Sequence, residues 1–271
     1  MKIFKNKVRL QNEILKDKSV SFIPTMGGLH NGHISLIKKA KKYKLKILVS
    51  IFINPKQFNN KKDYINYPRN IKKDLSLLKK LKIDIIYLPN FKDIYSFKTY
   101  NNIFLHTASK KLCGKKRKGH FKGVLNVVNR FLEIINPKYI FLGQKDFQQL
   151  YLIKEHIKKK FIKTKVISCK TIREKNGIAY STRNSMLNKK QLLIASKVYK
   201  YLKNKKFLFK KKDQNINFFN FKKELIKYGV KKIDYIDLLY LTNLNKVKNK
   251  KINFRIFIAY YLGKIRLIDN V

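Results

Sequence analysis

The sequence predicts an α/β protein: a Rossmann-like parallel sheet with helices on both faces, followed by a smaller α+β domain. Short apolar runs alternate with amphipathic helical patterns through the first two-thirds of the chain, which is the order of βαβ units. After about Thr171 the pattern changes to helical stretches followed by strand-like runs. We therefore expect one domain at residues 1–171 and a second at residues 172–271.

The expected strands of the first domain are four apolar runs, at residues 19–24, 46–53, 83–88 and 139–142. Each run is short and almost continuously apolar, as in strands buried on both faces. Helical periodicity predicts helices at residues 35–43, 70–81, 122–135 and 147–159. In the third of these, one arc at about 100° per residue holds the apolar residues Val124, Leu125, Val127, Val128, Phe131, Leu132, Ile134 and Ile135.

The second domain is expected to contain helices at residues 189–202 and 218–228 and strands at 233–241, 252–262 and 264–268. Helices grouped before strands indicate an α+β arrangement. The lysine-rich segment 204–217 lies between the two helices, and its charge predicts a solvated linker or loop.

The chain has 271 residues and a formal net charge of +50. Such a charge would suit nucleic acid or a membrane surface, and a basic nucleic-acid-binding protein is one alternative. However, the lysines are spread along the chain, and the abundance of Lys, Asn, Ile, Phe and Tyr also fits a genome rich in A and T. We expect no specific nucleic-acid partner.

No apolar run approaches the roughly 20 residues that span a bilayer, so we expect no membrane association and a cytoplasmic location. Cys113 and Cys169 are far apart and are expected to be reduced.

The run Pro24-Thr25-Met26-Gly27-Gly28-Leu29-His30-Asn31-Gly32-His33 follows an expected strand and opens an expected helix. Glycines let the backbone approach a ligand closely, and a helix N-terminus favours phosphate. Two histidines three residues apart can donate to charge that builds on a phosphoryl group. The alternative is a glycine-rich turn with incidental histidines.

Polar residues also follow the next strand and occupy the helix after it. Asn54 and Gln57 lie at the carboxyl end of the strand at 46–53, where parallel sheets bind ligands. Asp74 falls within the apolar arc of the helix at 70–81, where a carboxylate needs a partner. It is either held by the backbone or by Arg69, or it binds Mg²⁺ directly or through water.

Three later segments complete the set. Gly119-His120-Phe121-Lys122-Gly123-Val124 opens a helix. Gly143-Gln144-Lys145-Asp146 leaves the strand at 139–142; Lys145 can reach a phosphate and Asp146 a ribose hydroxyl, and Gln149 lies one turn further on. Tyr180-Ser181-Thr182-Arg183 places two hydroxyls beside a guanidinium, which suits a triphosphate.

In this order and spacing the segments resemble the pantothenate synthetase family of the nucleotidylyltransferase superfamily, from Pro24 to Asn270. The resemblance implies an AMP-forming ligase that uses ATP and Mg²⁺ to join pantoate to β-alanine through pantoyl adenylate, releasing AMP and pyrophosphate. It also implies a homodimer, with residues 1–171 binding ATP and pantoate and residues 172–271 acting as a lid. The closest rival is another adenylyltransferase acting on a different acceptor.

The resemblance assigns roles to individual residues. It implies that His33, His30 and Lys145 are catalytic, with His33 as proton donor, that Gln57 and Gln149 hold pantoate, and that Gln57 also faces β-alanine. The residues implied to bind ATP are Met26, Gly27, Gly28, Leu29, His30, Asn31, Gly32, His33, Gly143, Gln144, Lys145, Asp146, Ile172, Tyr180, Ser181, Thr182 and Arg183. Three of these depart from the family pattern: Gln144 replaces Glu, Tyr180 replaces Leu or Met, and Thr182 replaces Ser.

Overall fold

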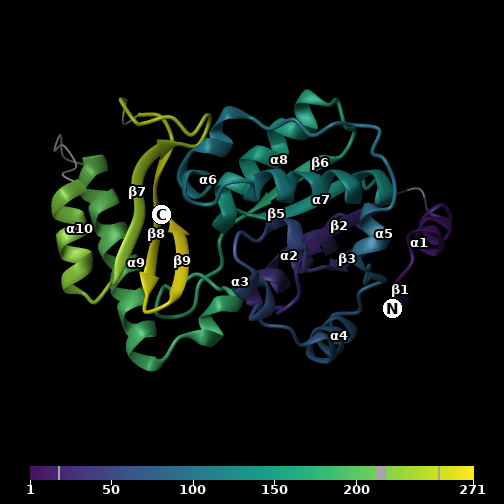
Figure 1. The fold of residues 1–271 in the computed structure, drawn as a ribbon, viewed down its shortest axis with the longest axis horizontal. Coiled ribbons are helices and arrows are strands. Elements are labelled where there is room, and N and C mark those ends of the chain that lie inside the picture. The colour runs from purple at the N-terminus through teal and green to yellow at the C-terminus, as the bar shows by residue number, and fades with distance from the viewer. Residues whose placement is uncertain (18, 212–217, 250) are drawn as a thin grey trace.

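The computed structural model describes residues 1–17, 19–211, 218–249 and 251–271. It contains a six-stranded parallel sheet with helices on both faces and a three-stranded antiparallel sheet (Figure 1). The predicted fold class is confirmed.

The parallel sheet has the strand order β1-β4-β3-β2-β5-β6. The four predicted runs become its inner strands β2 (Val20–Thr25), β3 (Lys46–Ile51), β4 (Ile85–Tyr87) and β5 (Tyr139–Gly143). The edge strands β1 (Lys2–Phe4) and β6 (Lys165–Cys169) were not predicted. Both contain half-exposed or exposed residues, so neither shows the continuous apolar pattern of a central strand.

Successive residues of each inner strand pack into hydrophobic cores on opposite faces of the sheet. Phe22 and Leu48 pack on one face of the sheet, against α7 (His120–Ile135) and α8 (Phe147–Lys159). Ile23 and Val49 pack on the other face, against α2 (Asn31–Lys41) and α4 (Ile71–Lys80). This two-residue alternation explains why the runs are apolar throughout. All eight predicted core residues of α7 are buried.

Short elements connect these layers. They are the helices α1 (Lys7–Ile14), α3 (Lys61–Ile65), α5 (Phe91–Tyr95) and α6 (Leu112–Lys116), and the 3₁₀ turns η1 (Pro55–Gln57), η2 (Thr107–Lys110), η3 (Gln144–Asp146) and η4 (Thr182–Met186).

The second sheet consists of β7 (Lys232–Tyr240), β8 (Phe254–Leu262) and β9 (Ile265–Asn270), in that order. One of its faces packs against α9 (Lys189–Lys211) and α10 (Phe218–Lys227), with Ile256 and Ile258 in that core. Phe257, between them, joins the core of the first domain. The sheet therefore contacts both parts of the chain (Figure 1).

The prediction of a loop at 204–217 was wrong for residues 204–211, because α9 continues to Lys211. Phe209 explains the difference: its side chain is buried and packs edge-on against Phe254, with ring centroids 5.5 Å apart. A helix can bury this residue on one face while its lysines remain in water. Residues 212–217 lie outside the described residues.

β6 ends at Cys169, and we propose the boundary predicted from the sequence, between residues 171 and 172, for the two domains. Cys113 and Cys169 are both free thiols and both buried. None of the helices in the part of the chain that the structure describes has the length and apolar character needed to cross a membrane.

Candidate active site

A cavity opens at the carboxyl ends of β2 and β5, neighbouring strands at which the order of the sheet reverses. Ligands of open α/β sheets bind at such a reversal. The cavity has about 1400 Å³ of empty space, part of it open to solvent. Its lining brings together Met26, His30, Gly32, His33, Gln57, Gly143, Lys145, Asp146, Gln149, Ile172, Tyr180, Ser181, Thr182 and Arg183.

The loop between β2 and α2 requires glycine at two positions. Gly27 and Gly28 have φ angles of 77° and 63°, values that favour glycine. A Cβ on Gly28 would lie 2.3 Å from the methyl carbon of Thr182. The glycines therefore allow both the turn and the close approach of the segment that contains Thr182.

His30 and His33 are held by backbone groups at the start of α2. The Gly32 N–H donates to His30 Nδ1 at 3.1 Å, and the His30 N–H donates to His33 Nδ1 at 3.3 Å. A ring nitrogen that accepts carries no proton, so each neutral ring carries its proton on Nε2. The ring centroids are 4.2 Å apart. The helix N-terminus thus presents two Nε2–H donors.

Burial keeps both rings neutral in the ligand-free protein. Burial, together with smaller electrostatic contributions from the neighbouring His30 and Lys145, lowers the pKa of His33 to about 3. Burial also lowers the pKa of His30 to about 4, with Lys145 adding to the shift and Asp146 opposing it. At pH 7 each histidine is therefore a hydrogen-bond donor rather than a cation. Permanent positive charge in the cavity comes from lysine and arginine.

Asp74 is held by the backbone of the loop that precedes α2. Its carboxylate accepts from the Gly28 N–H at 2.9 Å and from the Leu29 N–H at 2.8 Å, and the residue is 4% exposed. Arg69 instead donates to the Tyr64 carbonyl oxygen. Of the two protein partners considered for Asp74 from the sequence, these hydrogen bonds favour the backbone.

Gln57 is positioned by the segment that opens α7. Its carbonyl oxygen accepts from His120 Nδ1 at 2.8 Å and from Arg117 Nη2 at 3.2 Å. A Cβ on Gly123 would lie 2.2 Å from the Lys56 carbonyl oxygen, so only glycine lets η1 pack on α7 this closely. The sequence singled out residues 119–124 without a role, and the structure shows that they fix the Gln57 turn.

The segment 180–183 reaches across to the loop after β2. The Tyr180 hydroxyl accepts from Asn31 Nδ2 at 3.0 Å, and Thr182 Oγ1 donates to the Gly28 carbonyl oxygen at 3.1 Å. Arg183 Nη2 donates to both carboxylate oxygens of Asp63 at 3.1 Å. Both partners of this ion pair are partly exposed, so it contributes little and Arg183 can exchange Asp63 for an anionic ligand.

Several residues depart from the expected arrangement. The Gln144 carboxamide is engaged outside the cavity: its Nε2 donates to Ser168 Oγ at 2.9 Å, and its Oε1 accepts from Arg255 Nη2 at 2.7 Å. The cavity also has lining residues that sequence reasoning missed, among them Lys170 and the buried Tyr67. An apolar part of its wall consists of Phe52, Val124, Val127, Val128, Phe131 and Leu150. The periodicity of α7 marked four of these as core but did not show that they face a cavity.

The carboxylates of this region do not form a metal cage. Within residues 1–17, 19–211, 218–249 and 251–271, no three His, Cys, Asp or Glu side chains come together as metal ligands. Mg²⁺ at phosphate sites is usually held by one or two carboxylates together with the substrate phosphates.

A parallel sheet whose glycine loop leads into a helix N-terminus at the strand-order reversal defines a nucleotide-binding α/β protein. The profile of the Pantoate-beta-alanine ligase family matches residues 2–271. The chain belongs to this family of enzymes, which join pantoate to β-alanine by an amide bond.

Two curated relatives illustrate the similarity. The pantothenate synthetase of Francisella tularensis subsp. novicida is 41% identical over 263 residues, covering 96% of this chain and 92% of the relative. That of Clostridium botulinum is 40% identical over 269 residues, covering 97% and 95%.

Solved structures agree with the fold. The pantoate-beta-alanine ligase of Francisella tularensis, complexed with beta-gamma ATP and beta-alanine, has a TM-score of 0.83 and 38% identity, covering 100% of this chain and 97% of that one. The pantothenate synthetase of Thermus thermophilus has a TM-score of 0.88 and 26% identity, with 100% and 99% covered.

Proposed function

We propose that this chain activates pantoate by adenylation. A carboxylate oxygen of pantoate attacks the α-phosphorus of ATP, and pyrophosphate leaves with the electrons of the broken P–O bond. The amine of β-alanine then attacks the carbonyl carbon of pantoyl adenylate. The C–O bond to AMP breaks, the nitrogen loses a proton, and pantothenate and AMP are released.

The ATP phosphates are proposed to lie at the N-terminus of α2. There the Nε2–H groups of His30 and His33 and the ammonium of Lys145 can stabilise charge that builds during transfer. Ser181, Thr182 and Arg183 would hold the triphosphate, with Arg183 leaving Asp63. Tyr180 and Asn31, which already contact each other, would close over the same loop.

The nucleoside is proposed to lie along the residues that follow β5. Gly143 leaves open space, since a Cβ built there meets nothing within 4 Å, so its backbone can approach a ligand. Asp146 would accept from a ribose hydroxyl, and Ile172 would contact adenine. Because the side chain of Gln144 is engaged elsewhere, its proposed contribution is limited to the backbone.

Pantoate is proposed to lie between Gln57 and Gln149. Both glutamines line the cavity, and so does the apolar wall formed by Phe52, α7 and Leu150. Neutral amides suit the hydroxyls of pantoate, and the wall suits its two methyl groups. Gln57 would also face the incoming β-alanine. Pantoate carries both methyl groups and hydroxyls, so it matches an apolar wall beside two neutral amides. An amino acid would match less well, because its ammonium would require a carboxylate.

Mg²⁺ is proposed to arrive with ATP and to neutralise phosphate charge. The homodimer, the cytoplasmic location, the lid role of residues 172–271 and the lack of a specific nucleic-acid partner stay predictions.

The observation that supports this function most strongly is the convergence of His33, Lys145, Gln57 and Gln149 on one cavity.

The test is exchange of labelled pyrophosphate into ATP by the purified protein with Mg²⁺ and pantoate, without β-alanine. We expect exchange that depends on pantoate, and AMP release once β-alanine is added. ADP formation, or exchange that ignores pantoate, would refute the adenylation.

Replacing Asp74 by Asn should slow adenylation about tenfold or more at every Mg²⁺ concentration. Asn has one acceptor oxygen for two backbone N–H groups, and leaving one of them unpaired costs about 1–3 kcal/mol, which would loosen the phosphate loop. Initial rates measured over a Mg²⁺ titration check this. A metal-ligand role for Asp74, as predicted from the sequence, gives a different result: the rate of Asp74→Asn would recover at high Mg²⁺.

A further inference from the structure

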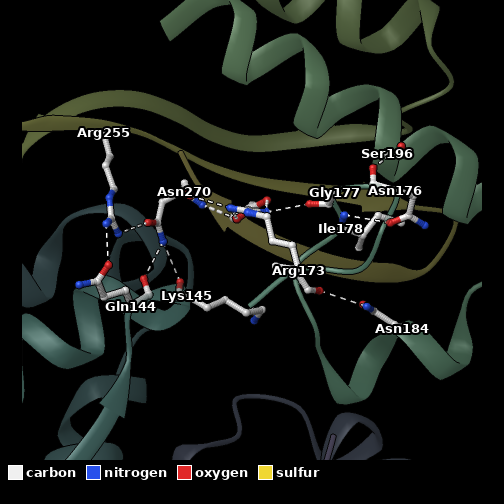
Figure 2. Close-up of polar contacts among 12 residues, drawn as sticks. Gln144, Lys145, Arg173, Asn176, Gly177, Ile178, Asn184, Ser196, Arg255 and Asn270 are labelled. Atoms are coloured by element: carbon white, nitrogen blue, oxygen red, sulfur yellow. Dashed lines mark hydrogen bonds and ion pairs between the residues drawn. The ribbon is translucent and has the colours of Figure 1, made fainter. Parts of the chain in front are cut away.

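The last strand of the chain ends against the loop that carries Lys145. Asn270, the final residue of β9, is 4% exposed. Its Nδ2 donates to the Gln144 carbonyl oxygen at 3.0 Å and to the Lys145 carbonyl oxygen at 2.9 Å. Figure 2 shows Asn270 between this loop and Arg255. One side-chain amide therefore holds two successive carbonyl groups of η3.

The orientation of this amide is fixed from the other side. Arg255 Nη1 donates to Asn270 Oδ1 at 2.7 Å, and Arg255 Nη2 donates to Gln144 Oε1 at 2.7 Å. A guanidinium can only donate, so the amide oxygen must face Arg255 and the amide nitrogen must face η3. Both N–H bonds of the amide are thereby directed at the loop.

Arg173 anchors the end of β9 in turn. Its guanidinium donates to both carboxylate oxygens of Asp269, at 2.7 and 2.9 Å, and to the Asn270 carbonyl oxygen at 3.1 Å. Both side chains of this ion pair are mostly buried, with 17% and 11% exposed. A bidentate pair of hydrogen bonds between a guanidinium and a carboxylate fixes the relative orientation of the two groups. The amide that holds η3 is thus attached to a rigid part of the second domain.

Side-chain support of the η3 loop includes the Gln144 carboxamide, which contacts Ser168 and Arg255. Among the described residues, no side chain caps η3 at Gly143 or α8 at Asp146. Lys145 nevertheless lines the cavity, and its side chain is only 20% exposed. The Lys145 ammonium lies 3.9 Å from the Asp146 carboxylate, and the Asn270 amide binds the backbone carbonyl of Lys145 and that of Gln144.

We propose that Asn270 is a positioning residue for Lys145: it aligns the catalytic ammonium by holding the Gln144 and Lys145 carbonyl groups, and so links the second domain to adenylation. The proposal rests on the proposed function. Asn270 is not one of the residues that line the cavity. Displacing a catalytic group by about 1 Å can lower the reaction rate by about 10². Loss of the two hydrogen bonds that hold the η3 carbonyl groups is therefore expected to lower the rate measurably.

Asn270→Asp tests this with little change of shape. The carboxylate keeps an oxygen for Arg255 but has no N–H to donate, and its second oxygen would face two carbonyl oxygens. We expect the turnover rate of pantoate-dependent pyrophosphate exchange to fall about 10- to 100-fold, with the KM for pantoate changing less than about threefold, because the pantoate glutamines are untouched. The matched control is Asn243→Asp: Asn243 is exposed, and its Oδ1 accepts from the Asn245 N–H at 2.9 Å, a bond that Asp retains.

A double variant separates positioning from general destabilisation. If Asn270 acts through Lys145, Asn270→Asp should slow exchange little further in a Lys145→Met background. A purely structural loss would lower the rate of that background as well and would overturn the proposal, as would wild-type exchange in Asn270→Asp. If Asn270→Asp does not fold, Asn270→Ala serves in the same comparison. Absence of exchange in the wild-type protein would instead refute the proposed function.

Discussion

His33→Ala should slow formation of pantoyl adenylate by about 10²–10³, the usual cost of losing one donor to transition-state charge. The structure gives the reason: the Nδ1 of His33 accepts from the His30 N–H, which leaves an Nε2–H donor at the N-terminus of α2. Pantoate binding should change much less, since the ring acts on phosphate. Single-turnover measurement of pyrophosphate release, with pantoate affinity measured separately, checks both parts.

His33→Gln supplies the matched comparison for that result. Glutamine retains a neutral N–H donor, so it should preserve more of the rate than alanine does. Near-normal pyrophosphate release in His33→Ala would contradict the assigned role. Equal losses in both variants would show that the ring itself, rather than its donor, is required.

Lys145→Met should lower the rate of adenylation by about 10²–10³, with the larger loss in turnover rather than in KM. Methionine keeps an apolar stem of similar length but removes the charge that faces the cavity. That charge also lowers the pKa values of His30 and His33, so its removal should raise them. Steady-state rates and an NMR titration of the two histidines check the prediction.

Lys154→Met is the control for this experiment, because Lys154 lies exposed on α8, the helix that follows Lys145. It should leave the rate unchanged and the histidine pKa values in place. An equal loss of rate in both variants would indicate that net charge, rather than the position of Lys145, supports the reaction.

Local patterns predicted the inner strands and the glycine-rich loop after β2, because their signals lie within a few residues. Gly27, Gly28 and His30 lie between β2 and α2, and His33 lies in the first turn of α2. Gln57 was placed by the rule that parallel strands end at one edge of the sheet, and Gln149 by its position one turn beyond the segment Gly143-Gln144-Lys145-Asp146. The strand order that brings β2 beside β5 then confirmed where the cavity lies.

Contacts between distant parts of the chain could not be predicted this way. Asn270 and Lys145 are 125 positions apart, and the sequence gives no sign that a terminal amide holds that loop. Asp74 was recognised as needing a partner, but the identity of that partner depends on where α4 packs. The extension of α9 to Lys211 was missed because the charge of its lysines obscured the buried Phe209.

The central claim is that pantoate is activated as an adenylate, and oxygen transfer tests it most directly. Pantoate labelled with ¹⁸O in its carboxylate should be incubated with ATP, Mg²⁺, β-alanine and the purified protein, and the products analysed by mass spectrometry. The carboxylate oxygen that attacks the α-phosphorus stays with AMP when the amine displaces it. We therefore predict one ¹⁸O atom in the phosphate of AMP and none in pyrophosphate. Label in inorganic phosphate, accompanied by ADP, would show activation as an acyl phosphate and would contradict the account.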